Sequence, residues 1–518
     1  MSTRPAVEAS VRLLAVNHFL QRFCAGLLAC AVLAAVPSIA AAGGSLSVGL
    51  ESELRGFDTV HGGSLDPAGE ITMRAIQEPL LRYNYEKGEP EPLLAVSWEI
   101  SDDQTVWTFK LRKDVKFHDG SDFTATDVAH HFNRALDPAQ KAAARATISV
   151  ISRVVEVDPH TVEFHLKHPW PSLPLVLANT GMSGPIPSHK AVDSGEQNRN
   201  PVGTGPFRMA RWSSGDRIVA ERFADYWAAD EISLDEVVFR FLPDTQTRFA
   251  SLKSGEIDVI WTDRGQTIHE AEKDPKLNAY VVDGAGAETI VLNARKAPLD
   301  DKRVRAAVAH AWNQVALVQV SWQNTRPVVS HPLGQSVDCG PDNYRQFDPA
   351  KAKALMAEYG QQISLTFVHT ATARGRELGE LMQQMLKQVG IRVVLEPVDQ
   401  STLMRRYYTH DYDIVGWRFP DSADMAPQLF SAVHSSSETN QSGVSTAEMD
   451  DVAEKMRLAA TREESVKYQC EVISHMNEEV AVIYRGGGRY HVFTNQRVQN
   501  LPKPWRGIID VTRVSLGD

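Results

Sequence analysis

The sequence is poor in cysteine and in positive charge. It contains 4 cysteines in 518 residues, and 65 acidic residues outnumber 54 basic ones, for a net charge of −11. An acidic chain without a stripe of lysine and arginine is a poor ligand for phosphate backbones, so we expect no nucleic-acid partner. The remaining composition, 43% hydrophobic and 23% charged, is that of a globular protein and excludes fibrous and wholly disordered classes.

The sequence also lacks the short motifs of the common enzyme classes. It contains no G-x-S-x-G, S-x-x-K, H-E-x-x-H, C-x-x-C or G-x-x-x-x-G-K-[ST] motif. Gly284-Ala285-Gly286 begins like a dinucleotide-binding loop but lacks the third glycine. The rings of the adjacent His130 and His131 would point about 100° apart on a helix, which does not suit a shared metal. We therefore expect no catalytic residue, no metal and no cofactor, although a catalytic triad assembles only in the folded chain.

The longest apolar stretch lies near the N-terminus. Phe23–Val36 follows a basic segment and precedes Ala40-Ala41-Ala42, which is the pattern of a secretory signal peptide cleaved after Ala42. The stretch is shorter than the ~20 residues that span a bilayer, and this argues against a membrane anchor. Residues 1–42 contain no Arg-Arg pair, which favours the Sec route. We expect residues 1–42 to be removed and the remainder to be a soluble protein of the periplasm.

The few cysteines leave two questions open. Leu27-Leu28-Ala29-Cys30 loosely resembles a lipid-attachment site, but the apolar stretch continues past Cys30 and argues against a lipoprotein. After cleavage only Cys339 and Cys470 remain, and an oxidising compartment allows them to pair. The apolar spacing around Cys470 favours a buried thiol. The sequence therefore leaves both a disulfide and free thiols open.

Strand and helix patterns alternate along residues 43–518. Leu46–Leu50 and Trp107–Leu111 alternate in polarity, as half-buried strands do, and a helix-like stretch covers Ile71–Leu81. Thr124 and Asp127 have the spacing of a capping box at a helix start. Strands and helices that alternate in this way predict α/β packing.

Glycine and proline mark further boundaries. Asp348-Pro349 predicts the start of a helix that Gly360 ends. Gly486-Gly487-Gly488 follows a strand-like run and predicts a hinge or a sharp turn. Asn200–Pro206 and Leu292-Asn293 are predicted junctions at which the chain crosses between lobes.

One continuous region resembles the signature of a known family. Leu94–Asp103, Trp107–Arg112, Val115–Gly120 and Phe123–Val128 are similar in residue type and spacing to the extracellular solute-binding proteins of family 5. These are the dipeptide-, oligopeptide- and nickel-binding components of ABC importers. Further runs resemble the family in the expected order: Pro201–Phe207, Leu252–Asp258, positions within Asn293–Ala306, Asp348–Ala352, Gly390-Ile391 and Asp413–Trp417.

This resemblance implies a fold, a division into domains and a function. The expected fold class is α/β, a type II periplasmic-binding-protein clamshell of two lobes with an extra domain. The first lobe would combine residues 43–77, 207–292 and 490–518, the extra domain 78–206, and the second lobe 293–489. The protein would bind a small peptide or peptide-like solute between the lobes and deliver it to an ABC permease complex in the inner membrane. We expect a monomer without enzymatic activity.

The resemblance also implies where a ligand binds. In the family's peptide binders, the region after the strand Asp413–Val415 offers a tryptophan, which Trp417 matches, and an aspartate that pairs with the ligand's ammonium group. Pro420 occupies the expected position of that aspartate. The role would therefore pass to Asp421 or Asp424.

Other candidates lie in separate segments. Gly56–Asp58 end the first strand and would line the cleft from the other side. Some dipeptide binders place an arginine for the ligand carboxylate in a loop where this chain has the displaced Arg374. The full set of candidate ligand-binding residues is Trp417, Asp421, Asp424, Arg418, Gly56, Phe57, Asp58, Arg374, His434 and Arg485.

Alternative ligands and roles stay open. The displaced arginine weakens a strict dipeptide assignment, and a metal chelate, an opine or an oligosaccharide would also suit a binder of this class. A periplasmic hydrolase on the same scaffold would convert its ligand, whereas a binder returns it unchanged. A sensor or chaperone subunit would act without transport.

Overall fold

The structure is a computed structural model, and it describes most of the chain from residue 43 onward. The described residues are 43–61, 67–84, 87–142, 144–178, 184–335, 337–340, 342–419, 422, 424–505 and 507–517. The predicted signal peptide with Cys30, and the candidate Asp421, lie outside the described residues. Within the described part, no helix has both the length and the apolar character needed to cross a membrane.

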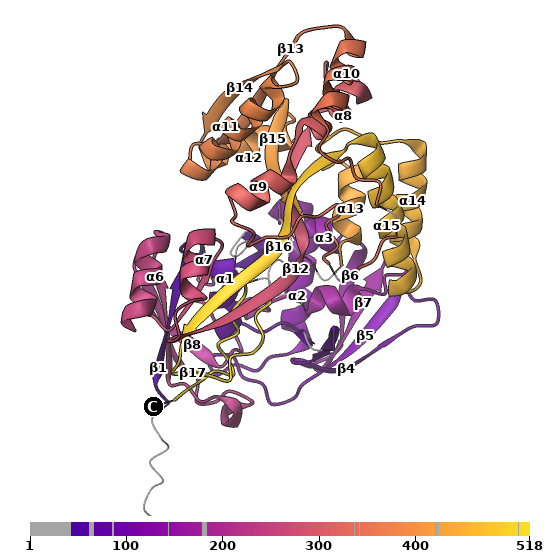
Figure 1. The fold of residues 1–518 in the computed structure, drawn as a ribbon. Helices are drawn as coiled ribbons and strands as arrows, with labels where there is room; N and C mark the ends of the chain where they lie inside the picture. Colours follow the sequence, from indigo (N-terminus) through magenta and orange to yellow (C-terminus); the bar gives the residue numbers. More distant parts are fainter. Residues whose placement is uncertain are drawn as a thin grey trace, which may run out of the picture. The chain divides into compact units, whose positions relative to one another are not determined.

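A ten-stranded mixed sheet forms the centre of the fold (Figure 1). It combines parallel and antiparallel neighbours and joins strands from both ends of the chain. In spatial order its strands are β14 (Ile391–Val398), β13 (Ile363–Thr370), β15 (Ile414–Phe419), β12 (Leu277–Leu292), β16 (Val482–Asn495), β11 (Val259–Thr262), β1 (Ser45–Leu50), β10 (Glu236–Phe241), β9 (Arg217–Arg222) and β8 (Phe207–Ser213).

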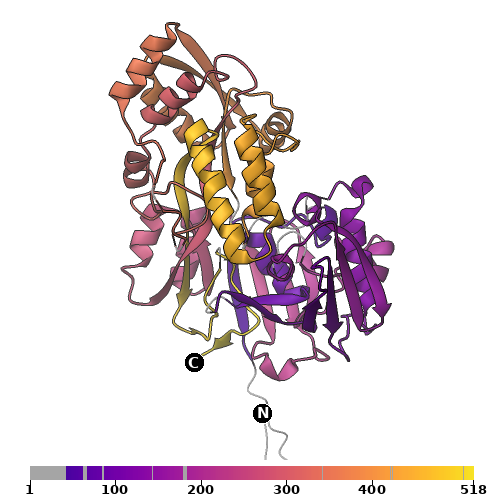
Figure 2. The ribbon, with the colours of Figure 1, turned by 90° about the vertical axis from the view of Figure 1, so that its right-hand side faces the viewer.

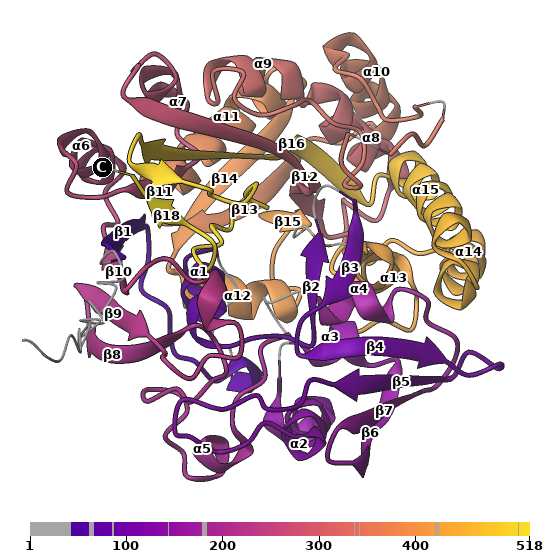
Figure 3. The ribbon, with the colours of Figure 1, turned by 90° about the horizontal axis from the view of Figure 1, so that it is seen from below.

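The two longest strands, β12 and β16, run side by side through both parts of this sheet (Figures 1 and 3). Their antiparallel register shifts between Asp283 and Ala287 and again between Glu288 and Thr289. On one side of the shifts, β16 also pairs with β11; on the other side, β12 pairs with β15. The strands that flank the β12–β16 pair therefore change at residues 283–289 of β12. This change lies before the junction predicted at Leu292-Asn293.

Two hydrophobic cores cover opposite faces of the β15–β12–β16 part of the sheet. Ile290 and Ile483 face one core, which α8, α9, α10 and α11 complete. Val291 and Tyr484 face the other core, together with α12, α13, α14 and α15; α14 and α15 pack side by side as the paired yellow helices of Figure 2. The helices are α8 (Lys302–Ala311), α9 (Gln314–Val320), α10 (Pro349–Tyr359), α11 (Ala373–Lys387), α12 (Gln400–Tyr408), α13 (Ala426–Val433), α14 (Ala447–Leu458) and α15 (Arg462–Glu479).

The other part of the ten-stranded sheet has cores of its own. Leu46, Val237 and Phe239 belong to one of them, and Ile260 and Phe493 to a smaller one beneath α6 and α7. The remaining elements of this part are α1 (Pro67–Ile76), α6 (Thr245–Ser254), α7 (Gly265–Ala271), the short 3-10 turns Thr59–His61 and Ala229–Glu231, and the strand pair β17 (Val498–Gln499) and β18 (Ser515–Leu516).

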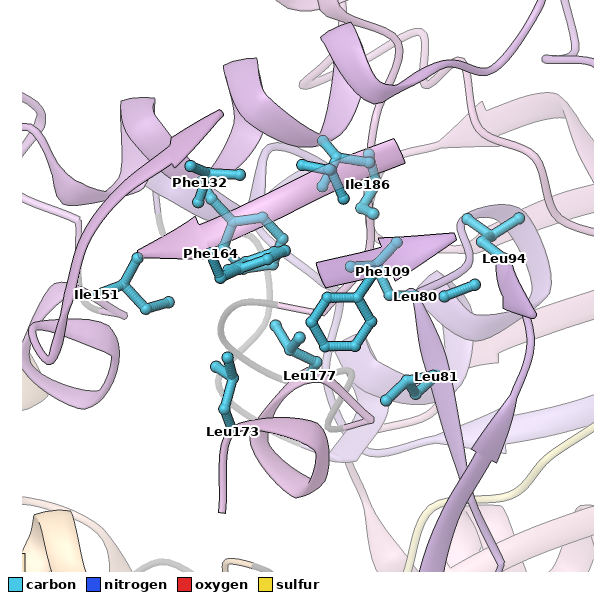
Figure 4. Packing of buried hydrophobic residues seen from close by; sticks show 14 of the residues in the cluster. Leu80, Leu81, Leu94, Phe109, Phe132, Ile151, Phe164, Leu173, Leu177 and Ile186 are labelled. Carbon is cyan, nitrogen blue, oxygen red and sulfur yellow. The ribbon is translucent and has the colours of Figure 1, made fainter. Parts of the chain in front are cut away.

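A separate four-stranded antiparallel sheet lies within residues 78–206, the segment predicted to be an extra domain. Its order is β4-β5-β7-β6, and Phe109, Phe132 and Phe164 meet in its core (Figure 4). The ring centroid of Phe164 lies 5.3 Å from that of Phe109 and 5.0 Å from that of Phe132. The elements are β4 (Ala95–Ile100), β5 (Val106–Leu111), β6 (Ile151–Asp158), β7 (Thr161–Leu166), the pair β2 (Leu81–Asn84) and β3 (Glu89–Pro92), α2 (Ala125–Leu136), the 3-10 turn Pro138–Gln140, α3 (Arg145–Ile148), α4 (Leu173–Leu177) and α5 (His189–Asp193).

Most local signals of the sequence are confirmed, and the extent of one helix is wrong. Thr124 and Asp127 form the predicted capping box of α2, and Asp348 and Gly360 cap α10. The helix predicted over Ile71–Leu81 instead ends at Ile76, because the carbonyl oxygen of Ile76 accepts a hydrogen bond from the Gly205 backbone N–H, donated at 3.0 Å.

For the glycine run, the sequence left a hinge or a sharp turn open, and the hinge stays a prediction. Gly486-Gly487-Gly488 lies inside the extended strand β16 and forms no sharp turn. None of these glycines is among the residues with positive φ. The close approach of Trp322 and Val329 to Gly486 and Gly487 explains these glycines better.

The structure settles the cysteine question in favour of a disulfide. Cys339 and Cys470 are bonded, with a Cα–Cα distance of 5.2 Å. The bond ties the segment before α10 to α15. Asn343 continues that attachment, because its Nδ2 donates to the carbonyl oxygen of Ser474 at 2.8 Å.

Replacing both Cys339 and Cys470 by serine should lower the free energy of unfolding by ~2–4 kcal/mol, because the bond closes a long loop and restricts the unfolded chain. Urea unfolding followed by circular dichroism measures the effect. A reductant should destabilise the wild type and leave the double variant unchanged. Equal midpoints for the wild type with and without reductant would contradict the prediction.

Candidate functional site

Five charged side chains from distant segments meet where β12 and β16 change register. Asp263 directly follows β11, Glu288 lies in β12 and Arg485 in β16. Arg326 comes from the segment between α9 and α10, and Arg374 lies in the first turn of α11. We call these five residues the charged network. It joins strand ends from both parts of the ten-stranded sheet.

Ion pairs connect the charged network. Arg485 binds Glu288, and its Nε also donates to the Thr289 carbonyl oxygen at 3.2 Å. Arg374 Nη1 lies 2.9 Å from Asp263 Oδ2. Arg326 is held less closely, with Nη2 3.5 Å from Asp263 and Nη1 3.8 Å from Glu288.

The positive charges dominate the network. Burial by itself would raise the pKa of Glu288, but the charges of Arg485, Arg326 and Arg374 lower it to about 2. Burial opposes ionisation of Asp263 as well, and Arg374 and Arg326 hold its pKa below the usual value. Burial lowers the pKa of Arg485 to about 10, so it stays charged at neutral pH. Within the network, three arginines face two carboxylates, and Glu51 acts on Arg374 as a third carboxylate from outside it.

The glycine run of β16 explains how Arg326 reaches this place. The segment Trp322–Val329 lies against it so closely that a Cβ on Gly486 would be 2.2 Å from Trp322 Cζ3, and one on Gly487 would be 2.5 Å from Val329 Cγ1. The Gly487 N–H also donates to the Pro327 carbonyl oxygen at 2.9 Å. Only glycine leaves room for this approach.

The predicted aromatic contact Trp417 lies on the opposite face of the sheet from Glu288. Trp417 is the register partner of Thr289, whereas Arg418 is the partner of Glu288, and partners in an antiparallel pair share a face. Trp417 is half-buried and stacks on Tyr407, with ring centroids 3.7 Å apart and planes 16° from parallel. One face of its indole ring is therefore already covered, while Arg418 is exposed.

Asp424 lies on the same side as Trp417, just before α13. Its Oδ1 accepts hydrogen bonds from the Ala426 N–H at 3.0 Å and from Gln469 Nε2 at 3.2 Å. The side chain is buried, and Oδ2 has no hydrogen-bond partner among the described residues. A buried carboxylate oxygen without a donor carries an energetic penalty that a cationic partner would remove.

Gly56–Asp58 do not end the first strand as predicted, because β1 ends at Leu50 and these residues lie in the segment after it. All three have structural partners. Phe57 is fully buried and meets Trp212 edge to face, with centroids 5.8 Å apart. Asp58 forms a bidentate pair with Arg134 at 2.5 and 3.0 Å, which holds its pKa below the usual value against the opposing effect of burial. Gly56 lies against Asn198, where a Cβ would clash.

His434 lies apart from the other candidate residues. Its ring stacks on Phe430 at 4.4 Å between centroids, and its Nε2 lies 3.4 Å from Glu454. Its Nδ1 meets Ser436 Oγ at 2.8 Å. The side chain thus secures the end of α13, and a ligand role for it stays a prediction.

The candidates therefore fall into two groups. The structure brings Arg374 and Arg485 together in the charged network, with Arg418 beside Glu288, while Trp417 and Asp424 lie across the sheet from them. Sequence reasoning missed Asp263, Glu288 and Arg326. Asp263 could have been selected from the sequence, because an acidic residue directly after a strand is a common feature of a binding site. Arg326 had no sequence feature beyond its charge that would have selected it.

Pockets occur away from the charged network. One of about 570 Å³ is lined by residues of β8 and by Arg199 to Val202, and one of about 580 Å³ lies beside α2. Neither includes Trp417 or Arg326. Among the described residues, no group of three or more histidine, cysteine, aspartate or glutamate side chains is arranged to hold a metal ion.

Comparison with known proteins gives this arrangement a class. A family model described as "Bacterial extracellular solute-binding proteins, family 5 Middle" matches residues 89–441. The glutathione-binding protein GsiB of Pectobacterium atrosepticum is 30% identical over 311 residues, which cover 59% of this chain and 60% of that protein. GsiB of Escherichia coli strain K12 is 28% identical over 71% of this chain and 76% of its own. Di/tripeptide-binding protein 1 of Pseudomonas aeruginosa is 28% identical over 76% and 78%.

Solved structures share the fold over nearly the whole chain. The binding protein AgaA of A. tumefacien R10, in complex with agropinic acid, has a TM-score of 0.80 and 26% identity, covering 92% of this chain and 99% of its own. DppA of Helicobacter pylori, in complex with the peptide STSA, has a TM-score of 0.80 and 23% identity, covering 92% and 98%.

The mixed α/β fold and these matches define a solute-binding protein. The chain belongs to the bacterial extracellular solute-binding proteins of family 5. The family expected from the sequence and its α/β fold class are confirmed, and the matched relatives are named as binding proteins rather than enzymes.

Replacing Gly486 by alanine should lower the free energy of unfolding by ~1–3 kcal/mol, because the new Cβ must displace the Trp322 ring. Gly416→Ala on strand β15 of the same sheet is a matched control, since its Cβ would meet the flexible end of Leu378 at 3.2 Å and lie in ordinary contact with Phe367 Cζ at 3.9 Å. Urea unfolding measures both variants. An equal loss in the two variants would show that close approach of Trp322 does not explain the glycine.

Glu288 should make the protein sensitive to acid. Its pKa is lowered from 4.5 to about 2 in the folded state, so its contribution to stability is complete above pH 4.5 and is lost as the pH falls through 2. Urea midpoints measured between these pH values should fall more steeply for the wild type than for Glu288→Gln. Identical slopes would remove Glu288 from the set of groups responsible.

Proposed function

We propose that the protein is the periplasmic substrate-binding component of an ABC importer and that it delivers a small peptide or peptide-like solute to a membrane permease. Membership of the family supports this role, as do relatives named as glutathione-binding and di/tripeptide-binding proteins. The charged network at the change of sheet neighbours is the observation that carries the proposal, because free peptides have charged ends that such side chains recognise. The predicted export signal and monomeric state belong to the same proposal.

The register shifts of β12 and β16 support a hinge. Two lobes that close around a ligand need connections that bend while the cores stay rigid. β12 and β16 are strands shared by both parts of the sheet, and their pairing is interrupted at 283–289. We place the hinge of the proposed clamshell there, with residues 78–206 as the extra domain and 293–489 contributing most of the second lobe.

The candidate residues suggest which ligand groups are recognised. Asp424 Oδ2 has no donor among the described residues and would accept a hydrogen bond from the ligand's ammonium group. Trp417 would contribute apolar contact through the indole surface that Tyr407 leaves uncovered. Arg418 would contribute from the other face of the same strand, and Asp421 stays a candidate from the sequence alone.

An opine is a second candidate ligand. The AgaA structure, at 26% identity, is a complex with agropinic acid. An acidic small molecule of this kind would match the arginines of the charged network. A role as a hydrolase has no comparable support, because the matched proteins are named for binding.

Isothermal titration calorimetry of the purified protein tests the proposal. We expect glutathione, or a dipeptide such as Met-Leu, to bind and to be recovered unchanged after long incubation. Failure of peptides and of an opine panel to bind would refute it, and recovery of a cleaved ligand would favour the hydrolase.

Asp424→Asn should weaken binding of the peptide on the order of tenfold, because a charge-assisted hydrogen bond is worth ~1.5–3 kcal/mol. The variant retains Oδ1, which accepts from Ala426 and Gln469, and changes only the unpartnered oxygen. A peptide with an acetylated amino group should bind the variant and the wild type equally. Unchanged affinity for the free peptide would exclude Asp424 from the site.

A further inference from the structure

We propose that Arg326 holds a carboxylate of the solute, next to Arg374, and thereby selects for anionic solutes. The inference rests on the proposed solute-binding function and deepens it. Arg326 is absent from the candidates that the sequence suggested. Its surroundings distinguish it from the other arginines of the charged network.

Arg326 is a buried cation with unused hydrogen-bonding capacity. Its side chain is 12% exposed. It contacts Asp263 and Glu288 only at 3.5 and 3.8 Å, and its Nε is buried without a hydrogen-bond partner among the described residues. A guanidinium group has several N–H donors. A buried donor that makes no hydrogen bond costs free energy, because it has also lost its bond to water. An acceptor supplied by the solute would satisfy them.

The neighbouring carboxylates are held more closely by other arginines than by Arg326. Glu288 is bound by Arg485, and Asp263 lies closer to Arg374 than to Arg326. The side chain of Arg374 is 40% exposed, which gives a solute access to this end of the network. A carboxylate at this place would face two guanidinium groups.

The backbone around Arg326 is held in place before any ligand arrives. His491 Nε2 contacts the Thr325 carbonyl oxygen at 3.1 Å, and the Gly487 N–H donates to the Pro327 carbonyl oxygen at 2.9 Å. The Arg326 guanidinium lies 5.0 Å from the centroid of Trp322. A donor fixed in this way loses little conformational entropy on binding, which favours affinity.

Asp263 would compete with a solute carboxylate for Arg374 and Arg326. Its Oδ2 is the oxygen that both Arg374 and Arg326 approach. A solute carboxylate would share these arginines with Asp263 or take its place. Removing the charge of Asp263 should therefore strengthen binding of an anion, a result opposite to that expected for a purely structural ion pair.

Calorimetry with glutathione, which has more carboxylates than ammonium groups, tests the inference. Arg326→Gln should weaken its binding on the order of tenfold, and Asp263→Asn should tighten it. Glutathione amide, which lacks the glycine carboxylate, should bind the wild type more weakly and lose little further affinity in Arg326→Gln. Arg392→Gln, an exposed arginine of β14, is the control and should bind like the wild type. Equal affinity of Arg326→Gln and the wild type for glutathione would overturn the inference.

A second measurement decides the inference even if no peptide binds. Succinate should raise the thermal unfolding temperature of the wild type through mass action and should do so less in Arg326→Gln. Equal shifts in the two proteins would overturn the carboxylate site. Absence of peptide binding together with a shift that depends on Arg326 would instead refute only the peptide assignment.

Discussion

The pairing of β12 with β16 is the interaction on which the rest of the structure depends. Among the described strands, these two pair on both sides of the register shifts. Every other strand of the large sheet belongs to one side. The same pair places Glu288 next to Arg485 and brings the ends of β11 and α11 close enough for Asp263 to meet Arg374. Backbone hydrogen bonds thus determine where the charges gather.

The charged network is only partly satisfied by interactions within the protein. Charges removed from water are stable only when paired and hydrogen-bonded, and Glu288 with Arg485 satisfies that condition. Arg326 does not, since its contacts are long and its Nε has no partner within the part of the chain that the structure describes. An imbalance of this kind is expected where a protein binds a partner of opposite charge, because the missing interactions are completed only in the complex.

Sequence patterns predicted much of the fold but only part of the site. The capping box of α2 and the ends of α10 were predictable, because each signal involves residues a few positions apart. Gly486 was noticed as part of a glycine run, but its reason, the ring of Trp322, comes from a segment far away along the chain. Trp417 was selected by resemblance, which could not indicate that Tyr407 covers one of its faces.

The sequence by itself determined the family, the α/β class and the absence of the usual catalytic motifs, since these depend on residue type and local spacing. Only the tertiary structure decided that Cys339 pairs with Cys470 and that Asp263, Glu288 and Arg326 share one place. The physical reason is that charges act through space over a few ångströms. Which charges come within that distance depends on strand register and close packing, and neither is visible in the order of residues alone.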